Sequence, residues 1–567
     1  MYVLEEVKKA LKEKISEIVN AKESEISFEI PPKEEFGDIS FPCFMISKKL
    51  KKPPNEVAAR IAEKFGSYEY VKKVDVAGGY VNFILDWPKL SSKILEEITR
   101  AGKNYGRGKK KNKKVMIEFC QANTHKAFHM GHVRNICIGE SLSRIFEFAG
   151  YDVIRVNYQG DIGPHVAKCI WGFLKLYNGK PPEDVDKGKW LGDVYAKANK
   201  AARENPDIQK EISEINQKIY AKDKEIYKVW ETTRGWCLKY FDKIYKDFGI
   251  KFDRLYFESE VEKIGTEVAK SLLKKGIARL SEGTILVDLE KYGLGVFLLV
   301  KSDGTPLYSA KDLGLSTLKS KEYGNIDISI HVVGSEQRLY FQQLFKTFEL
   351  MGSPLAKKSY HLAYELVNLP TGKMSSREGN VILYEDVEKE LEKHALEETK
   401  KRNPKMPEEK LDEISRKIAI SALMYDMVKV SPNKSIIFDL KKALELEGNA
   451  APYLQYTYVR AKSILEKAGK AEKTSGYAYD NVHEYRLIRS IARFPEIVER
   501  AANDMRPHYI ANFAFEISDR FNEFYQFVNV IKSGEAEKWA RLNLVKSFMI
   551  VLKNSLDILG IYIPERM

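Results

Sequence analysis

Cysteine is scarce in this sequence, and the few cysteines that occur are scattered along it. The 567 residues include only 5 cysteines, and none of them forms a C-x-x-C pair. Zinc sites and disulfide frameworks both need cysteines at short, regular spacings. The sequence therefore predicts no structural metal and no disulfides, and it favours a reducing, intracellular compartment.

Long apolar runs are missing as well. Every apolar stretch is far too short to span a bilayer, and residues 1–7 lack the form of a secretory signal peptide. We therefore expect a cytoplasmic protein with no membrane partner. The 44% hydrophobic content and the length of 567 residues are sufficient for several domains with their own cores.

Negative charge is the smaller share of the charged residues. Lys and Arg number 93 against 80 Asp and Glu, which gives a formal net charge of +13. This balance suits a polyanionic partner, although it also fits many soluble proteins that bind no nucleic acid. The basic run Lys109–Lys114 is most simply a solvated linker, and beside an RNA-binding domain it would add sequence-independent attraction to phosphates.

The stretch with the clearest chemistry is Gln121–Asn135, which contains His129-Met-Gly-His132. A short apolar segment typical of a buried strand precedes it, and apolar residues at helical spacing follow it. A turn between a strand and a helix attracts phosphate groups through free backbone N–H groups and the helix dipole. Gly131 leaves space for a ring or a phosphate, and the two histidines are close enough in sequence to face one ligand.

A second stretch, Lys373–Asn380, favours a nucleotide-binding role for these histidines. The histidine pair alone would fit a structural or metal-binding role about as well, although no nearby cysteine or carboxylate completes a metal set. Together and in this order, about one Rossmann domain apart, the two stretches resemble the two signatures of class I aminoacyl-tRNA synthetases. The resemblance implies ATP as a substrate and these catalytic or ATP-binding residues: Lys126, His129, Gly131, His132, Gly334, Lys373, Met374 and Ser375.

The core is predicted to be an α/β domain with a Rossmann-type doubly wound parallel sheet. A second strand, Val153–Val156, completes a strand–helix–strand unit, and Asn157–His165 follows at its carboxyl end, where such folds bind ligands. An alternating stretch, Ile326–Val333, begins the second half of the sheet. We assign residues 110–380 to this catalytic domain, with a helical insertion at about 180–250.

Residues 1–86 are predicted to form a separate small α/β domain, which opens with an amphipathic helix and closes with a hairpin. Phe36–Ser40 and the closing strand Tyr80–Leu85 resemble the N-terminal domain of arginyl-tRNA synthetases, which in that family holds the elbow of the tRNA. The resemblance implies tRNA contacts for Asn82 and Phe83, since bases stack on aromatic rings. Chemistry alone favours an ordinary strand pair at these two positions.

Five positions match the arginine-pocket pattern of arginyl-tRNA synthetases: Glu before the histidine turn, Asn within it, Tyr-x-x-x-Asp, and Gln after the later strand. A guanidinium requires carboxylates in its plane, and the α-amino and α-carboxyl groups need polar partners. Spacing alone would leave the aspartate as an ordinary acid on a helix surface. The resemblance implies Asp312 for the guanidinium, Asn123 and Tyr308 in direct contact with arginine, and Glu118 and Gln337 for its polar groups.

The Lys373 loop departs from the class I pattern, because Ser376 stands where the signature has its second lysine. Lys126 lies three residues before His129, on the turn that faces the same phosphates. Some arginyl-tRNA synthetases lack the loop lysine and carry a lysine before the histidine turn instead, and this chain resembles that compensated form. The alternative is that Lys126 is merely solvated, and a contribution of Arg377 to the phosphates stays open.

The last part of the chain is predicted to be helical. Residues 381–445 are rich in Lys and Glu and are expected to bridge toward the tRNA stem, and residues 446–567 form a further all-helical domain. Glu447–Arg460 resembles the opening of the anticodon-binding domain of arginyl-tRNA synthetases. We predict that Tyr458 and Arg460 in this stretch face RNA, although tyrosines at helical spacing are more often part of a core.

The resemblance to arginyl-tRNA synthetases covers nearly the whole chain. It implies that L-arginine and ATP, with Mg2+, form arginyl-adenylate, and that arginine then passes to the 3′ end of tRNA(Arg). Bound tRNA is expected to be needed for the first step, and the protein is expected to be a monomer. The rivals are a class I synthetase for cysteine or lysine, a shorter nucleotidyltransferase, and a non-catalytic RNA-binding descendant. The missing zinc cluster, the N-terminal domain, the helical last third and the intact signatures count against them.

Overall fold

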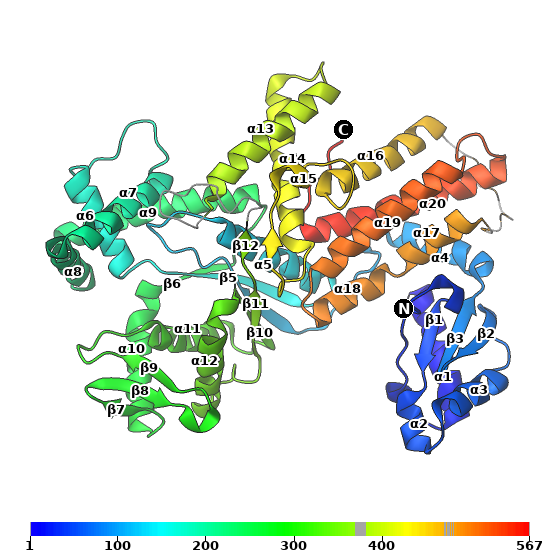
Figure 1. Ribbon diagram of the computed structural model, residues 1–567, viewed down its shortest axis with the longest axis horizontal. Helices are drawn as coiled ribbons and strands as arrows, with labels where there is room; N and C mark the ends of the chain where they lie inside the picture. The colour runs from blue at the N-terminus through cyan, green and yellow to red at the C-terminus, as the bar shows by residue number, and fades with distance from the viewer. Residues whose placement is uncertain are drawn as a thin grey trace. The chain divides into compact units, whose positions relative to one another are not determined.

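Five parallel strands form the central sheet, in the order β11-β10-β4-β5-β6 (Figure 1). The chain runs from β4 through β5 to β6, and it returns on the other side of β4 with β10 and β11. The order therefore reverses between β4 and β10, the point at which doubly wound sheets bind ligands. This topology confirms the predicted Rossmann-type architecture. The strands are β4 (Lys114–Glu118), β5 (Asp152–Gln159), β6 (Arg254–Phe257), β10 (Ile328–Gly334) and β11 (Ser359–Tyr364).

The computed structural model describes residues 2–368, 382–469, 472, 474, 477, 479 and 481–565. The chain divides into two units. The larger unit, which contains the central sheet, consists of Arg107–Tyr456, Val498–Asn512 and Leu556–Met567; the smaller consists of Met1–Gly106, Thr457–Ile497 and Phe513–Ser555. None of the helices in the described ranges combines the length and the apolar character of a transmembrane span.

Helices α10 and α11 of the larger unit pack unusually close together, because glycines face each other at their contact. A Cβ atom on Gly265 would lie 2.3 Å from the carbonyl oxygen of Ala310, and one on Gly314 would lie 2.6 Å from the amide nitrogen of Gly265. Any side chain at either glycine would therefore force the helices apart. The helices nearest the sheet are α5 (Met130–Phe148), α10 (Glu258–Lys274), α11 (Tyr308–Tyr323) and α12 (Arg338–Leu350).

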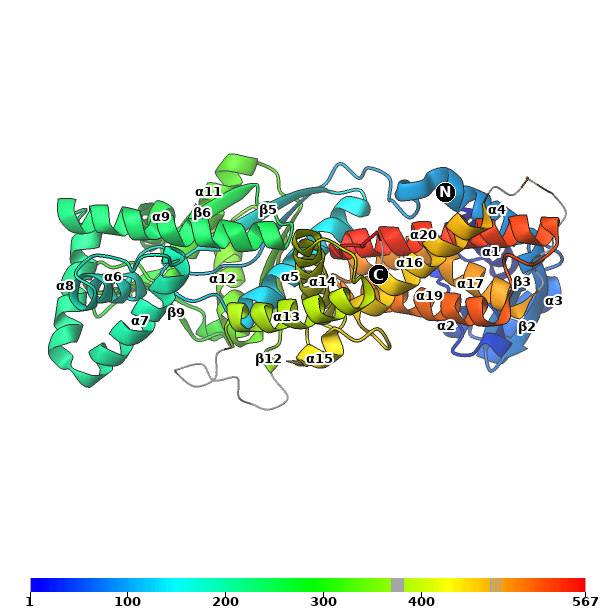
Figure 2. The same ribbon diagram turned by 90° about the horizontal axis from the view of Figure 1, so that it is seen from above.

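Helices α6 to α9 form an insertion between β5 and β6, and Figures 1 and 2 both show them grouped together. Ile212, Ile215 and Ile219 of α8 are buried, so the apolar face of this amphipathic helix packs into the insertion. A small antiparallel sheet, β7-β8-β9, precedes α11 and was not predicted. The elements are α6 (Pro164–Leu176), α7 (Lys187–Glu204), α8 (Pro206–Tyr220), α9 (Lys224–Asp247), β7 (Arg279–Ser281), β8 (Thr284–Asp288) and β9 (Val296–Val300).

Two long helices, α13 and α14, follow the central sheet and pack against each other, and α14 also packs against α5. Their presence agrees with the helical segment predicted for residues 381–445. A short parallel pair of strands, β12 and β13, connects the end of the sheet region to the segment after α14. The elements are α13 (Tyr384–Arg402), α14 (Glu408–Val428), α15 (Leu440–Ala443), β12 (Val367–Asn368) and β13 (Ile436–Ile437).

The smaller unit begins with an α/β fold around a three-stranded antiparallel sheet, β1-β3-β2. Gly78 and Gly79 have φ of 55° and 85° and make the tight turn of the predicted hairpin. Strand β3 is the middle strand, and residues on both of its faces are buried. The elements are α1 (Val3–Val19), β1 (Ile39–Pro42), α2 (Phe44–Leu50), α3 (Pro54–Lys64), β2 (Val71–Ala77), β3 (Tyr80–Leu85) and α4 (Trp87–Ala101).

The C-terminal part of the chain is helical, as predicted. Within the smaller unit α17 packs on α4, and Phe521 stacks on Phe548 with ring centroids 4.1 Å apart. The helices are α16 (Ala451–Ala468), α17 (Val482–Ala492), α18 (Phe494–Asn503), α19 (His508–Phe527) and α20 (Glu535–Leu559).

Candidate active site

The histidine turn lies where β4 gives way to α5, as the sequence predicts. The backbone N–H of Gly131 donates to Nδ1 of His129 at 3.1 Å, and the N–H of His129 donates to Nδ1 of His132 at 3.2 Å. The two imidazole rings stack with centroids 3.7 Å apart. Because both Nδ1 atoms accept, each neutral ring carries its proton on Nε2. The turn therefore carries two Nε2–H donors.

The electrostatics of this turn favour an anion. Burial, together with the ammonium of Lys126, lowers the pKa of His129 to about 4 and holds the pKa of His132 well below its usual value. Both rings are therefore neutral near pH 7. Burial and the neighbouring ammonium of Lys168 lower the pKa of Lys126 itself. Among the described residues, no carboxylate lies within ion-pairing distance of Lys126, so its charge is available to a phosphate.

The second signature falls outside the described residues, so the predicted Lys373, Met374 and Ser375 have no described positions. The chain that follows this segment is nevertheless bound to the histidine turn. The N–H of Met130 donates to the carbonyl of Ile382 at 2.9 Å, and the N–H of Tyr384 donates to the carbonyl of Phe128 at 3.1 Å. The fold thus brings the downstream end of the Lys373 segment to the first signature.

Arg134, a residue that the sequence analysis missed, holds the chain before that segment. It is fully buried in α5, and its guanidinium donates to the carbonyls of Leu366 at 3.1 Å and Lys434 at 2.7 Å, and to that of Glu365. Burial lowers its pKa to about 10, so it remains charged at neutral pH. The histidine helix therefore fixes both β12 and the segment after α14.

A cavity of about 310 Å3 opens at the carboxyl edge of the sheet, beside the point where the strand order reverses. Four of the five residues predicted to bind arginine line this cavity. The fifth, Asn123, does not line it and instead accepts the N–H of Gly160 at 3.2 Å. Further lining residues include Tyr158, Lys319, His331 and Tyr340, which the sequence analysis missed; the predicted ones are Glu118, Tyr308, Asp312 and Gln337.

Glu118 is ionised in the cavity. Burial alone would raise the pKa of this carboxyl, but the ammonium of Lys319 and the imidazole of His331 outweigh burial and hold the pKa below its ordinary value. Lys319 donates a hydrogen bond to one oxygen of Glu118, and His331 Nδ1 lies 3.5 Å from the other. Lys319 therefore cancels the charge of Glu118 before any substrate binds.

Asp312 has the opposite character. Burial, together with the neighbouring charges of Glu118 and Glu258, raises its pKa to about 7, although the hydroxyl of Tyr340, which donates to Asp312, and the ammonium of Lys319 oppose the rise. No cation among the described residues lies within ion-pairing distance of Asp312. Of the two carboxylates that line the cavity, Glu118 is thus balanced by a lysine, and Asp312 is left to pair with a positively charged ligand.

Arginine binding is expected to weaken as the pH falls below about 7, because protonated Asp312 cannot pair with a guanidinium. In the limit the dissociation constant rises by about tenfold for each pH unit. Titration calorimetry with arginine between pH 5.5 and 8.5, at roughly one-unit steps around that pKa, measures this dependence. The Asp312→Asn variant should show a flat profile, and a flat profile in the unchanged protein would contradict the assignment.

The structure disagrees with the tRNA contacts predicted for Asn82 and Phe83. Phe83 is fully buried, and Asn82, 4% exposed, accepts a hydrogen bond from Ser40 Oγ at 2.6 Å. The reason is that β3 is covered on both faces, so neither side chain is presented to RNA. Arg460 is half-buried and donates to Asn522 Oδ1 at 2.6 Å; Tyr458 is also half-buried.

The parallel sheet with its order reversal, the histidine turn at the start of α5 and the adjoining end of the Lys373 segment define a class I aminoacyl-tRNA synthetase. Family models agree over nearly the whole chain: "tRNA synthetases class I (R), catalytic domain" matches residues 94–440, "Arginyl tRNA synthetase N terminal domain" residues 5–85, and "DALR anticodon binding domain" residues 454–567. Class I synthetases use ATP, which suits the anion-binding turn.

Comparison with relatives shows which family of class I synthetases the chain belongs to. The arginine–tRNA ligase of Clostridium perfringens is 35% identical over 567 residues, covering 99% of this chain and 100% of the relative. That of Bdellovibrio bacteriovorus is 34% identical over 550 residues, covering 95% and 93%. The structure of Thermus thermophilus arginyl-tRNA synthetase is similar with a TM-score of 0.80 at 26% identity, covering 99% of this chain and 100% of that one. The chain belongs to the arginyl-tRNA synthetase family.

Proposed function

We propose that this protein activates L-arginine with ATP and transfers it to the 3′ end of tRNA(Arg). The observation that carries this proposal is the charge of the cavity: Lys319 neutralises Glu118, whereas no cation in the part of the chain that the structure describes forms an ion pair with Asp312. A guanidinium supplies one delocalised charge and donors in a plane, which suits such a site. Among amino acid side chains, arginine therefore fits best.

Activation needs no nucleophile from the protein. A carboxylate oxygen of arginine attacks the α-phosphorus of ATP; the new O–P bond forms as the bond to pyrophosphate breaks, and its electron pair leaves on the pyrophosphate. The protein must align the reactants and stabilise the charge that builds on the phosphate oxygens. His129 and His132 offer Nε2–H donors for this purpose, and Lys126 and Lys373 offer charge. Mg2+ accompanies the phosphates of ATP.

We infer that bound tRNA is required for the first step and that the protein acts as a monomer in the cytoplasm. Residues 1–86 would bind the tRNA elbow, residues 381–445 the stem, and residues 446–567 the anticodon. The similarity of the N-terminal and C-terminal regions to the corresponding family models supports this division. The net charge of +13 suits a partner as acidic as tRNA.

The experiment that tests the proposal is ATP–pyrophosphate exchange with each standard amino acid, with and without total tRNA. Arginine alone should support exchange, and only when tRNA is added. Exchange with another amino acid would keep the class I chemistry and overturn the assignment of the cavity. Exchange with arginine in the absence of tRNA would remove only the tRNA requirement.

A further inference from the structure

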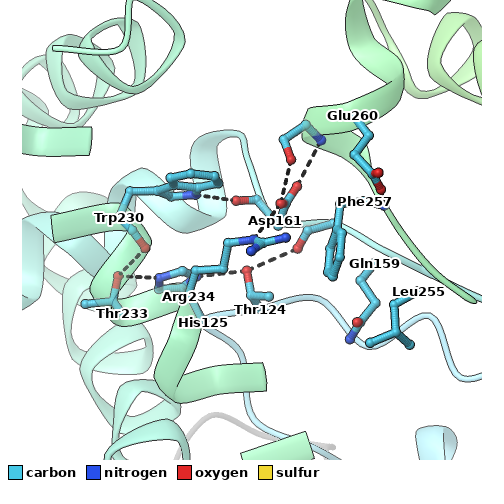
Figure 3. A network of polar contacts seen from close by, with 12 residues as sticks. Thr124, His125, Gln159, Asp161, Trp230, Thr233, Arg234, Leu255, Phe257 and Glu260 are labelled. Carbon is cyan, nitrogen blue, oxygen red and sulfur yellow. Dashed lines mark hydrogen bonds and ion pairs between the residues drawn. The ribbon is translucent and has the colours of Figure 1, made fainter. Parts of the chain in front are cut away.

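The Gly160-Asp-Ile-Gly163 segment after β5 has no role in the chemistry described above, yet its carboxylate is the centre of a buried network (Figure 3). The side chain of Asp161 is 0% exposed. One oxygen accepts the N–H of Ser259 at 3.0 Å, and the other accepts Ser259 Oγ at 2.7 Å and Arg234 Nε at 2.8 Å. Trp230 Nε1 donates to its backbone carbonyl at 2.7 Å. One residue therefore joins the end of β5 to α9 and to the start of α10.

On the α10 side, the network leads to the arginine cavity. The residue before Ser259 is Glu258, and its carboxylate pairs with Lys311 Nζ at 2.8 Å in a buried contact. Lys311 lies in the first turn of α11, directly before Asp312 and three residues after Tyr308. Because glycines let α10 and α11 pack closely, a shift of the start of α10 must carry the first turn of α11 with it.

On the loop side, the same segment holds the turn that leads to the phosphate donors. The N–H of Gly160 donates to Asn123 Oδ1 at 3.2 Å, and the carbonyl of Gly160 accepts the N–H of Thr124 at 3.0 Å. A Cβ atom at Gly160 would lie 2.4 Å from Asn123 Oδ1, so only glycine permits this contact. Thr124 stands two residues before Lys126. The Asp161 segment is thus connected both to the helix start that carries the arginine cavity and to the turn that leads to the phosphate-binding residues.

On the α9 side, Arg234 is the charge partner of Asp161. Its guanidinium lies 4.0 Å from the centroid of the Phe257 ring and 5.4 Å from that of Trp230. A parallel link runs through His125, whose ring nitrogens contact Thr124 Oγ1 at 2.9 Å and Thr233 Oγ1 at 2.8 Å (Figure 3). Buried ion pairs add little net stability, because desolvation offsets their attraction. The Asp161–Arg234 ion pair is therefore better explained by the orientation that it imposes on α9 relative to the end of β5.

We propose that Asp161 is a positioning residue, which together with Arg234 of the inserted helices fixes the arginine cavity relative to the phosphate-binding turn. This inference rests on the proposed function. It assigns to α9 a part in substrate alignment rather than a purely architectural role. A displacement of about 1 Å at a reacting group can reduce a rate on the order of 10²-fold, so the effect is measurable even though Asp161 touches no substrate.

Asp161→Asn tests the proposal. Both carboxylate oxygens of Asp161 accept hydrogen bonds. In either orientation of the asparagine amide, its NH2 group therefore faces a donor, and a hydrogen bond is lost. With tRNA present, kcat/KM for arginine in ATP–pyrophosphate exchange is expected to fall on the order of 10²-fold, with a rise in the KM for arginine. The Arg234→Met variant should act in the same direction, and the double variant should be little worse than Asp161→Asn alone.

Glu140→Gln is the matched control. Glu140 is also a buried carboxylate paired with arginine, with Arg144 Nε at 2.7 Å and Arg155 Nε at 2.9 Å, but unlike Asp161 it has no hydrogen bond to α10 among the described residues. An Asp161→Asn protein that loses thermal stability as Glu140→Gln does, with an unchanged KM for arginine, would overturn the inference, as would additive effects in the double variant. If Asp161→Asn does not fold, Arg234→Met carries the same test. A wild-type protein without arginine-dependent exchange would instead overturn the proposed function and this inference together.

Discussion

Replacing Lys126 with alanine is expected to slow adenylate formation by about 10²–10³-fold and to leave the affinity for tRNA nearly unchanged. The ammonium lies close enough to His129 and His132 to lower the pKa of both imidazoles, so its field reaches a phosphate that binds at this turn. A phosphate bound there would contact one charge and two neutral N–H donors. Alanine removes the only charged group among these three side chains, at the place where negative charge builds on the phosphate oxygens during the reaction. ATP–pyrophosphate exchange and filter binding of tRNA measure the two quantities.

Lys168→Ala provides the matched control for this prediction. Lys168 is near enough to lower the pKa of Lys126, but its own ammonium donates to Asn199 Oδ1 at 2.9 Å. Its removal should change the exchange rate little. An active Lys126→Ala protein would show that another residue supplies the charge at the phosphates, with Arg377 as the first candidate. A Lys168→Ala protein as impaired as Lys126→Ala would show that the positive electrostatic potential of the region matters, and not a contact of Lys126 itself.

The catalytic fold could be predicted from the sequence because its signals are local. A buried parallel strand is a continuous apolar run, and α5 follows directly after the histidine turn, so both elements are legible without their neighbours. The β7-β8-β9 sheet left no such signal. Its strands are short, and Leu280, Val296 and Leu298 are exposed, so the pattern of apolar residues does not mark a buried face.

The cavity was predictable only in part. Tyr308 and Asp312 were assigned through the family resemblance, because a tyrosine and an acid at helical spacing are common on any helix surface. Lys319, His331 and Tyr340 were missed, since they come from α11, β10 and α12 and meet only in the folded protein. Only His331 could have been suspected from the sequence, because it is the one titratable residue in β10.

The prediction for Asn82 and Phe83 failed for a related reason. Alternation along a strand separates two faces, but it does not tell whether one of them is open. In this domain β3 is the central strand, Phe28 and Phe65 pack on Phe83, and Ser40 from β1 satisfies the amide of Asn82. A hydrogen-bonded asparagine in a covered strand is a structural partner, and the sequence alone does not distinguish it from an exposed one.

Asp312→Asn is expected to raise the KM for arginine on the order of 10²-fold, because truncating one partner of a buried charge pair removes about 2–5 kcal/mol. Asparagine keeps the size of the side chain and can still accept from Tyr340, so the cavity keeps its shape and loses only its charge. The variant should also discriminate less between arginine and citrulline, whose uncharged ureido group has nearly the shape of a guanidinium. Exchange kinetics with arginine, and its inhibition by citrulline, measure both effects.

Glu322→Gln is the control that isolates the position of the charge. Glu322 lies on the same helix, α11, and accepts a hydrogen bond from a tyrosine as Asp312 does, with Tyr256 Oη at 2.7 Å, but it does not line the cavity. Its replacement should leave the KM for arginine unchanged. If instead both variants were equally impaired, the loss would come from helix α11 as a whole; if neither were impaired, the guanidinium would have to be bound by Glu118 alone, with Lys319 displaced from it.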